Sequence, residues 1–248
     1  MDTNLDIKFD ANEIYRDALQ PAVREIGKGL EKIAKTANLI LAPFTLCGAY
    51  NTRFEKWCER VENEVDEKNM QEAQPNILLP TLAGLAINPD ETLLGEMFFN
   101  ILKSSIDKTK QKFLSPAFPK ILEQLSKDEA VMLVLLKKQN YRYHTEINLN
   151  RQENQRTILD EFPKDKLEFQ ENLWIYNDHL HNLNLSGCWE YKQQETIYSG
   201  RIIEQGSGAF SCPIPEKIGI KHFMEFGLTD FGKHFVEACI SPKCEEYI

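Results

Sequence analysis

Several features that would assign this 248-residue chain to a class of proteins are missing from its sequence. No run approaches the roughly 20 consecutive apolar residues that a helix needs to cross a bilayer, so we expect no membrane-spanning helix. The first ten residues, MDTNLDIKFD, are polar and acidic and lack the apolar centre of a secretory signal. The sequence therefore predicts a cytoplasmic protein.

The familiar catalytic motifs are also missing. The chain contains no Walker loop, no G-x-S-x-G and no H-E-x-x-H. Its glycine-rich turn, Gly206-Ser207-Gly208, lacks the length and the following helix that a phosphate-binding loop requires. We therefore predict a non-enzymatic protein with no catalytic residue and no cofactor.

Cysteine spacing gives no sign of disulfides or of a metal site. The six cysteines are spread along the chain without paired spacing, which indicates free thiols in a cytoplasmic protein. His179 and His181 form an H-x-H with Cys188 further on, but the two histidines point to different sides of the expected helix. We therefore expect no bound zinc. The cysteines are Cys47, Cys58, Cys188, Cys212, Cys239 and Cys244.

The charge balance argues against nucleic acid as a partner. The formal net charge is −9, and residues 141–248 hold 11 Lys and Arg against 17 Asp and Glu. Residues 167–191 contain no Lys or Arg at all. Because phosphate contacts need cations, DNA binding through this segment is not expected.

The N-terminal part predicts an amphipathic helical hairpin. One helix spans about residues 11–41, and a second, with Phe54, Trp57 and Val61 on its apolar stripe, runs to Lys68. An apolar patch separates them. It either packs in the core or contacts a membrane surface or a partner, although the acidic second helix disfavours an anionic bilayer. The patch consists of Leu39, Ile40, Leu41 and Phe44.

The sequence predicts the starts of three helices within residues 75–138. Asp90 is expected to cap the first helix, and Ser115 the second, with Pro116 at its first position. Ser126 followed three residues later by Glu129 is typical of a capping box on the third. Helices joined this closely predict a compact helical block.

The same stretch carries a family resemblance. NILLPTLAGLAIN, DETLLGEMFFNILKSSID and SPAFPKILEQLSKDEA resemble the central signature of the abortive infection alpha family, bacterial proteins associated with defence against phage. The similarity extends from about Ile14 to Cys239. It implies a biological setting and supplies no active site, because the matching motifs are helix caps and apolar faces.

The C-terminal part predicts a winged helix. Residues 140–165 are polar and indicate a loop with a short helix near 157–162, and residues 167–183 return to helical spacing. A final helix is capped by Thr229 or Asp230. The order helix, short helix, helix, strands, helix is typical of a winged helix. The expected strands are residues 185–191, 196–204 and 218–226.

Together these patterns predict a mainly α protein, with a helical domain over residues 1–140 and a winged-helix-like α+β domain over 141–248. The expected function is antiphage defence through contacts with a protein partner, with itself, or with the surface of the inner membrane. Two alternatives remain: a winged-helix DNA-binding regulator, and a hydrolase or nuclease with an unfamiliar site.

Overall fold

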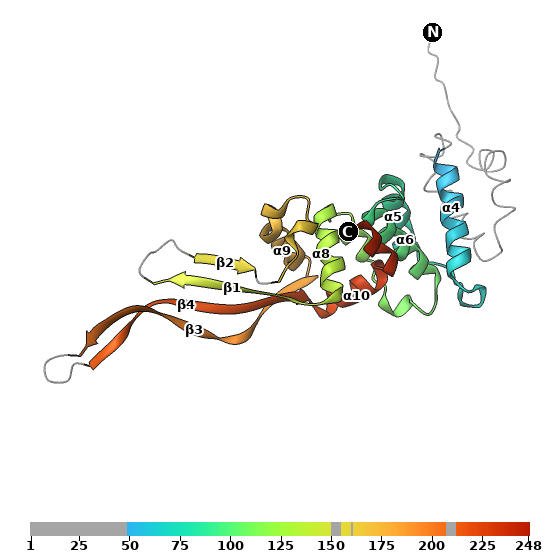
Figure 1. The fold of residues 1–248 in the computed structure, drawn as a ribbon. Coiled ribbons are helices and arrows are strands. Elements are labelled where there is room, and N and C mark those ends of the chain that lie inside the picture. The colour runs from blue at the N-terminus through green and yellow to red at the C-terminus, as the bar shows by residue number, and fades with distance from the viewer. Residues whose placement is uncertain (1–48, 150–154, 160, 207–211) are drawn as a thin grey trace, which may run out of the picture. The chain divides into compact units, whose positions relative to one another are not determined.

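The computed structural model describes residues 49–149, 155–159, 161–206 and 212–248 (Figure 1). They form two compact units. Unit 1 contains residues 49–125 and the C-terminal segment Glu237–Tyr247, and unit 2 is Ser126–Val236. The division predicted after residue 140 falls inside unit 2.

Unit 1 is a helical block. Its helices are α4 (Ala49–Glu64), α5 (Pro75–Ile87), α6 (Leu93–Ile106) and α7 (Phe118–Leu122), with short 3-10 helices η1 (Glu67–Asn69), η2 (Gln111–Phe113) and η6 (Pro242–Tyr247). Helix α6 lies at the centre, because α4, α5, α7 and η6 all contact it. Its apolar face supplies side chains with no exposed surface, which fixes the core of the unit. These include Met97, Phe98 and Ile101.

The expected cap of α6 is wrong by two residues. Helix α6 begins at Leu93, and Thr92 is its N-cap, since the Thr92 hydroxyl accepts a hydrogen bond from the backbone N–H of Gly95. Asp90 has a different role. Its carboxylate accepts hydrogen bonds from the Arg53 guanidinium at 2.8 and 3.1 Å and from the Trp57 indole N–H at 2.9 Å.

Arg53 also binds the end of α5, because it donates to the carbonyl oxygens of Leu85 and Asn88 at 2.9 and 2.7 Å. Partial burial raises the pKa of Asp90, but the hydrogen bonds from Arg53 and Trp57 outweigh it, so the net pKa lies below its usual value. Asp90 therefore ties the turn between α5 and α6 to α4 rather than starting a helix.

The predicted start of α7 is also wrong. The helix begins at Phe118 with Ala117 as its N-cap, and Pro119 rather than Pro116 occupies the first turn. The Ser115 hydroxyl accepts a bond from the Ala117 N–H at 3.3 Å within the preceding turn. Ser115 therefore stabilises the turn before the helix and does not cap the helix.

The capping box of helix α8 (Lys127–Lys138) is confirmed. The Ser126 hydroxyl accepts from the Glu129 N–H at 3.3 Å, and the Glu129 carboxylate accepts from the Ser126 N–H at 2.6 Å. Two backbone N–H groups that the start of the helix would leave open are thereby satisfied.

Replacing Ser126 by alanine should lower the free energy of unfolding by about 1 kcal/mol, because one N–H of the first turn loses its acceptor. Urea denaturation of the parent and of Ser126→Ala measures this. A midpoint identical to that of the parent would show that the cap contributes nothing.

Unit 2 is built on a four-stranded antiparallel sheet, so the prediction of a mainly α protein is wrong and the fold is α+β. The strands β1 (Tyr141–Asn148), β2 (Gln155–Leu159), β3 (Ser186–Gln205) and β4 (Cys212–Leu228) are arranged in the order β2-β1-β4-β3. The loop and short helix predicted for residues 140–165 are β1 and β2 instead. The polar composition of these residues did not indicate strands, and β1 pairs with β4, which is far along the chain.

Aromatic side chains fill the base of this sheet. Phe226 lies within 5.4–6.3 Å, centroid to centroid, of the rings of Tyr141, Tyr143, Phe162 and Trp174. Trp174 comes from α9 (Leu173–Asn182), the α-helical part of the longer helix predicted over 167–183. Burial raises the pKa of the Tyr143 hydroxyl. The final helix α10 (Asp230–Cys239) is capped by Thr229, one of the two predicted caps, because the Thr229 hydroxyl accepts from the Gly232 N–H.

Candidate interaction surface

The apolar patch at the tip of the N-terminal hairpin, predicted to be either core or a contact surface, lies outside the described residues. The whole of the first predicted helix, residues 11–41, also lies outside them, as does the glycine turn at Gly206-Ser207-Gly208 apart from Gly206. The second predicted helix is present as α4, with Phe54, Trp57 and Val61 buried along one face.

The structure uses the histidines of the H-x-H for separate contacts. The His179 Nδ1 lies 2.5 Å from a Glu129 carboxylate oxygen, and the His181 Nδ1 lies 3.1 Å from the backbone carbonyl of Ser186. Across the part of the chain that is described, no three His, Cys, Asp or Glu side chains come together as a metal site would need. Cys188, on β3, contacts the Asn177 amide at 3.6 Å.

The four cysteines whose side chains the structure describes differ in exposure. Cys58, Cys239 and Cys244 are buried, and Cys188 is exposed. Burial, and next the carboxylates of helix α4 beginning with Glu62, raise the pKa of the Cys58 thiol to about 12. This thiol therefore stays protonated and unreactive at neutral pH.

The most distinctive surface of unit 2 is the ribbon made by β3 and β4. The two strands pair antiparallel from Ser186–Leu228 to Gln205–Cys212, whereas the pairing of β1 with β4 ends at Asn148–Gly219. The ribbon therefore continues past the end of β1 as two strands alone (Figure 1). We call this two-stranded part, together with residues 195–197 of β3 beside the end of β1, the outer ribbon; it consists of residues 195–205 and 212–218.

Large apolar side chains are exposed along β3. Nine such side chains are exposed in the described residues, and five of them belong to this one strand. Tyr198, Ile202 and Ile203, in the outer ribbon, are 57%, 71% and 41% exposed. Scattered exposed apolar residues are ordinary on a protein surface, but a concentration on one strand marks a contact surface. The other two are Trp189 and Tyr191.

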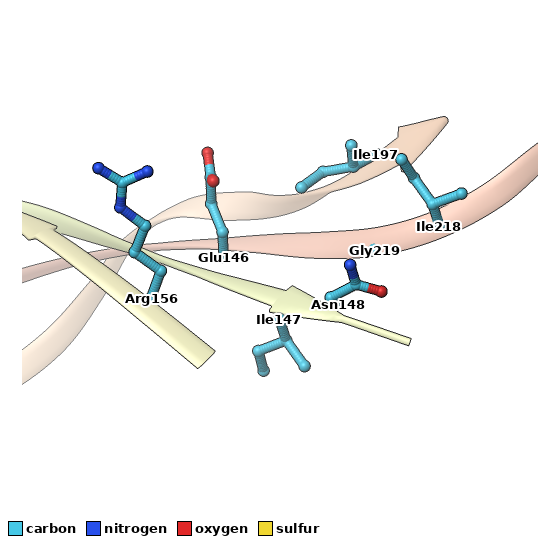
Figure 2. A pocket seen from close by; sticks show the side chains of 7 residues that line it. All are labelled: Glu146, Ile147, Asn148, Arg156, Ile197, Ile218 and Gly219. Carbon is cyan, nitrogen blue, oxygen red and sulfur yellow. The ribbon is translucent and has the colours of Figure 1, made fainter. Parts of the chain in front are cut away.

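A shallow depression of about 430 Å³ lies where the outer ribbon meets β1 and β2. In Figure 2 the side chains of Glu146, Arg156 and Ile197 rise from one side of the sheet, while Ile147 points to the opposite side. Glu146 and Arg156 are directly paired across β1 and β2, which places opposite charges side by side. Gly219 also lies in the lining. A side chain there would clash with the neighbouring strand, because its Cβ would come within 2.7 Å of the Ile147 carbonyl oxygen.

This lining combines apolar and charged side chains, which suits an amphipathic chain. Ile197 and Ile218 offer apolar contact beside one carboxylate and one guanidinium. The depression therefore extends the apolar surface of the outer ribbon onto the sheet.

Sequence reasoning placed strands at 196–204 and 218–226 but did not single out their surface. The signal was present in Ile202-Ile203, because neighbouring residues of a strand point to opposite faces. Adjacent isoleucines therefore put an apolar side chain on each face of a ribbon, and one of the two must stay exposed unless a partner covers it.

None of the described helices is long and apolar enough to cross a membrane. No curated protein and no solved structure matches the chain, so the predicted winged helix stays a prediction. The family described as abortive infection alpha matches residues 49–239, which includes all of α4 to α10. The chain therefore belongs to the abortive infection alpha family, in agreement with the resemblance seen in its central helices.

Proposed function

We propose that this protein acts in abortive infection without catalysis, by binding a protein partner through the outer ribbon. Family membership supports the defence role. The observation that supports the contact surface is the gathering of five of the nine exposed large apolar side chains on β3.

The low stability expected of an uncovered two-stranded ribbon favours binding to a partner. Two strands without a covering layer are only marginally stable in water, and burial of their apolar side chains by another protein would stabilise them. The outer edge of β3 also has backbone N–H and C=O groups available for an added strand.

A lipid surface is a poorer occupant than a protein. An open strand edge would carry unpaired backbone groups into hydrocarbon, where no water can satisfy them. The outer ribbon also carries charged side chains at Glu195, Arg201 and Lys217. A protein surface can pair both kinds of group.

DNA is also disfavoured as the partner. Helix α9 is the helix that would read DNA in a winged helix, and its sequence LWIYNDHLHN has no Lys or Arg. Its exposed residues include Asp178 and Ile175. Such a surface would repel phosphates rather than release their counterions.

Replacing Ile202 by lysine should abolish protection of a bacterial host against phage, because a charge would then stand in the centre of the contact surface. Plaque formation on cells that express the parent or the variant measures protection. Since Ile202 is 71% exposed, the melting temperature should not change.

Ile87→Lys is the matched control. Ile87 is 77% exposed and lies at the end of α5 in unit 1, whereas β3 belongs to unit 2. This variant should protect as the parent does. A folded Ile202→Lys protein that still protects fully would contradict the proposed contact surface.

A further inference from the structure

The three open edges of the sheet in unit 2 are not equivalent. Strand β2 forms one edge and has only five residues. The outer edge of β4 is open beyond Gly219 but carries Pro213 and Pro215. Strand β3 forms the opposite edge, is 20 residues long and contains no proline. Short strands and prolines protect sheet edges from pairing, so among the described strands only β3 has an edge without such protection.

The prolines of β4 block strand addition on their side. Pro213 and Pro215 are opposite Glu204 and Ile202 in the pairing of β3 with β4. Residues two apart direct their backbone groups to the same edge, and a proline within a paired strand faces the open edge because it has no N–H to donate. A strand added outside β4 would therefore find two donors missing.

The outer edge of β3 is self-complementary in charge. Tyr198 has Glu195 three residues before it and Arg201 three residues after it. If two copies of β3 lie antiparallel about Tyr198, each Glu195 comes near Arg201 of the other copy. Glu195 would then exchange Lys192, its ion-pair partner at 2.5 Å, for that guanidinium. Gly200 has open space above the face of the strand, with no atom within 4 Å of the position a Cβ would take. Such a glycine permits close approach of another backbone.

We propose that two copies of the chain associate through the outer edges of β3, about a twofold axis at Tyr198. This inference rests on the proposed function and names the partner as a second copy. Because the β4 edge cannot accept β3, head-to-tail addition is blocked, and pairing of β3 with β3 closes after two copies.

Side chains and a short stretch of backbone carry this contact. The ladder between β3 and β4 is irregular between Lys192 and Glu195 and again between Tyr198 and Ile202. Glu195–Ile197 keeps regular pairing with Lys221–Gly219. About an axis at Tyr198 this regular segment faces residues 199–201 of the other copy, where the Ser199 hydroxyl already contacts the Arg201 N–H and carbonyl oxygen. Side chains around Tyr198 therefore supply most of the contact.

Light scattering of the full chain after size exclusion should give the mass of a dimer for the parent. Tyr198→Glu and Tyr198→Lys should each give half that mass, because like charges meet at the axis. An equimolar mixture of the two variants should return to the dimer mass, since glutamate then faces lysine. Tyr198 is 57% exposed, so both variants should fold, and Tyr198→Phe should remain a dimer as the control.

A monomeric parent, or a mixture that stays monomeric while each variant is folded, would overturn the dimer. If Ile202→Lys nevertheless loses protection, the proposed function still holds, and the outer ribbon binds a protein other than a second copy of this chain. If the mixture associates but Ile202→Lys protects fully, the dimer stands and the proposed function fails.

Discussion

Replacing Arg60 by methionine is expected to lower the free energy of unfolding by about 3 to 5 kcal/mol, because it leaves a buried carboxylate without its main partner. Glu96 on α6 is 2% exposed. The Arg60 guanidinium contacts its two carboxylate oxygens at 2.8 and 3.1 Å. Guanidinium denaturation, followed by circular dichroism, measures the loss.

Two further contacts of Arg60 and Glu96 bear on this expectation. The guanidinium carbon lies 3.6 Å from the centre of the Phe99 ring, and that stacking is also lost in the variant. Lys243 reaches a Glu96 oxygen at 3.0 Å, but its side chain is 44% exposed. Lys243→Met should therefore cost much less than Arg60→Met, because Arg60 would still hold the carboxylate.

The double variant Arg60→Met with Glu96→Gln provides the control. Glutamine keeps the shape of glutamate and removes the buried charge, so the double variant should be more stable than Arg60→Met alone. If the second substitution makes the protein less stable still, the cost of Arg60→Met arises from lost packing on Phe99 rather than from the unpaired charge.

Local signals in the sequence were read correctly where both partners of a contact are close in the chain. The capping box works between Ser126 and Glu129, and Thr229 caps a helix through Gly232, three residues on. A cap is a contact within one turn, so its residues can be recognised without knowledge of the fold.

The errors lie where a distant partner decided the structure. Asp90 looks like a cap, but Arg53, 37 residues earlier, takes its carboxylate. The polar sequence of β1 looks like a loop, but Tyr143 pairs with Met224 on β4. A strand gains its hydrogen bonds and its buried face from a neighbour that single-sequence patterns do not identify.

The same limit applies to the candidate surface. The sequence showed that Ile202-Ile203 lies in a strand, but exposure depends on whether a further layer covers the strand. The charges of the region predicted to be a winged helix were informative without the fold, because the absence of Lys and Arg in α9 holds in any arrangement. The contact surface required the sheet order, which places β3 at an edge.

Replacing Gly84 by alanine should lower the free energy of unfolding by about 3 kcal/mol, at the upper end of the cost of overpacking a core. An added Cβ would lie 2.1 Å from one carbon of the Phe98 ring and within 2.5 Å of two more. Phe98 has no exposed surface, and its ring is held between α5 and α6. The ring cannot move aside without displacing its neighbours.

Shortening the ring should relieve this clash. In the double variant Gly84→Ala with Phe98→Leu, the leucine leaves space for the new methyl group, so the loss of stability should be smaller than the sum of the two single losses. A double-mutant cycle in urea measures the difference. Losses that simply add would show that the methyl group introduced by Gly84→Ala does not meet Phe98.

Gly232→Ala in unit 2 is the contrasting case. A Cβ there would lie 1.9 Å from the backbone carbonyl oxygen of Leu185, and the same carbonyl accepts the Thr229 N–H at the start of α10. No side-chain truncation can relieve a clash with backbone, so Leu185→Ala should not rescue this variant. Rescue at Gly84 and none at Gly232 would establish that the obstacle is a side chain at the first glycine and the main chain at the second.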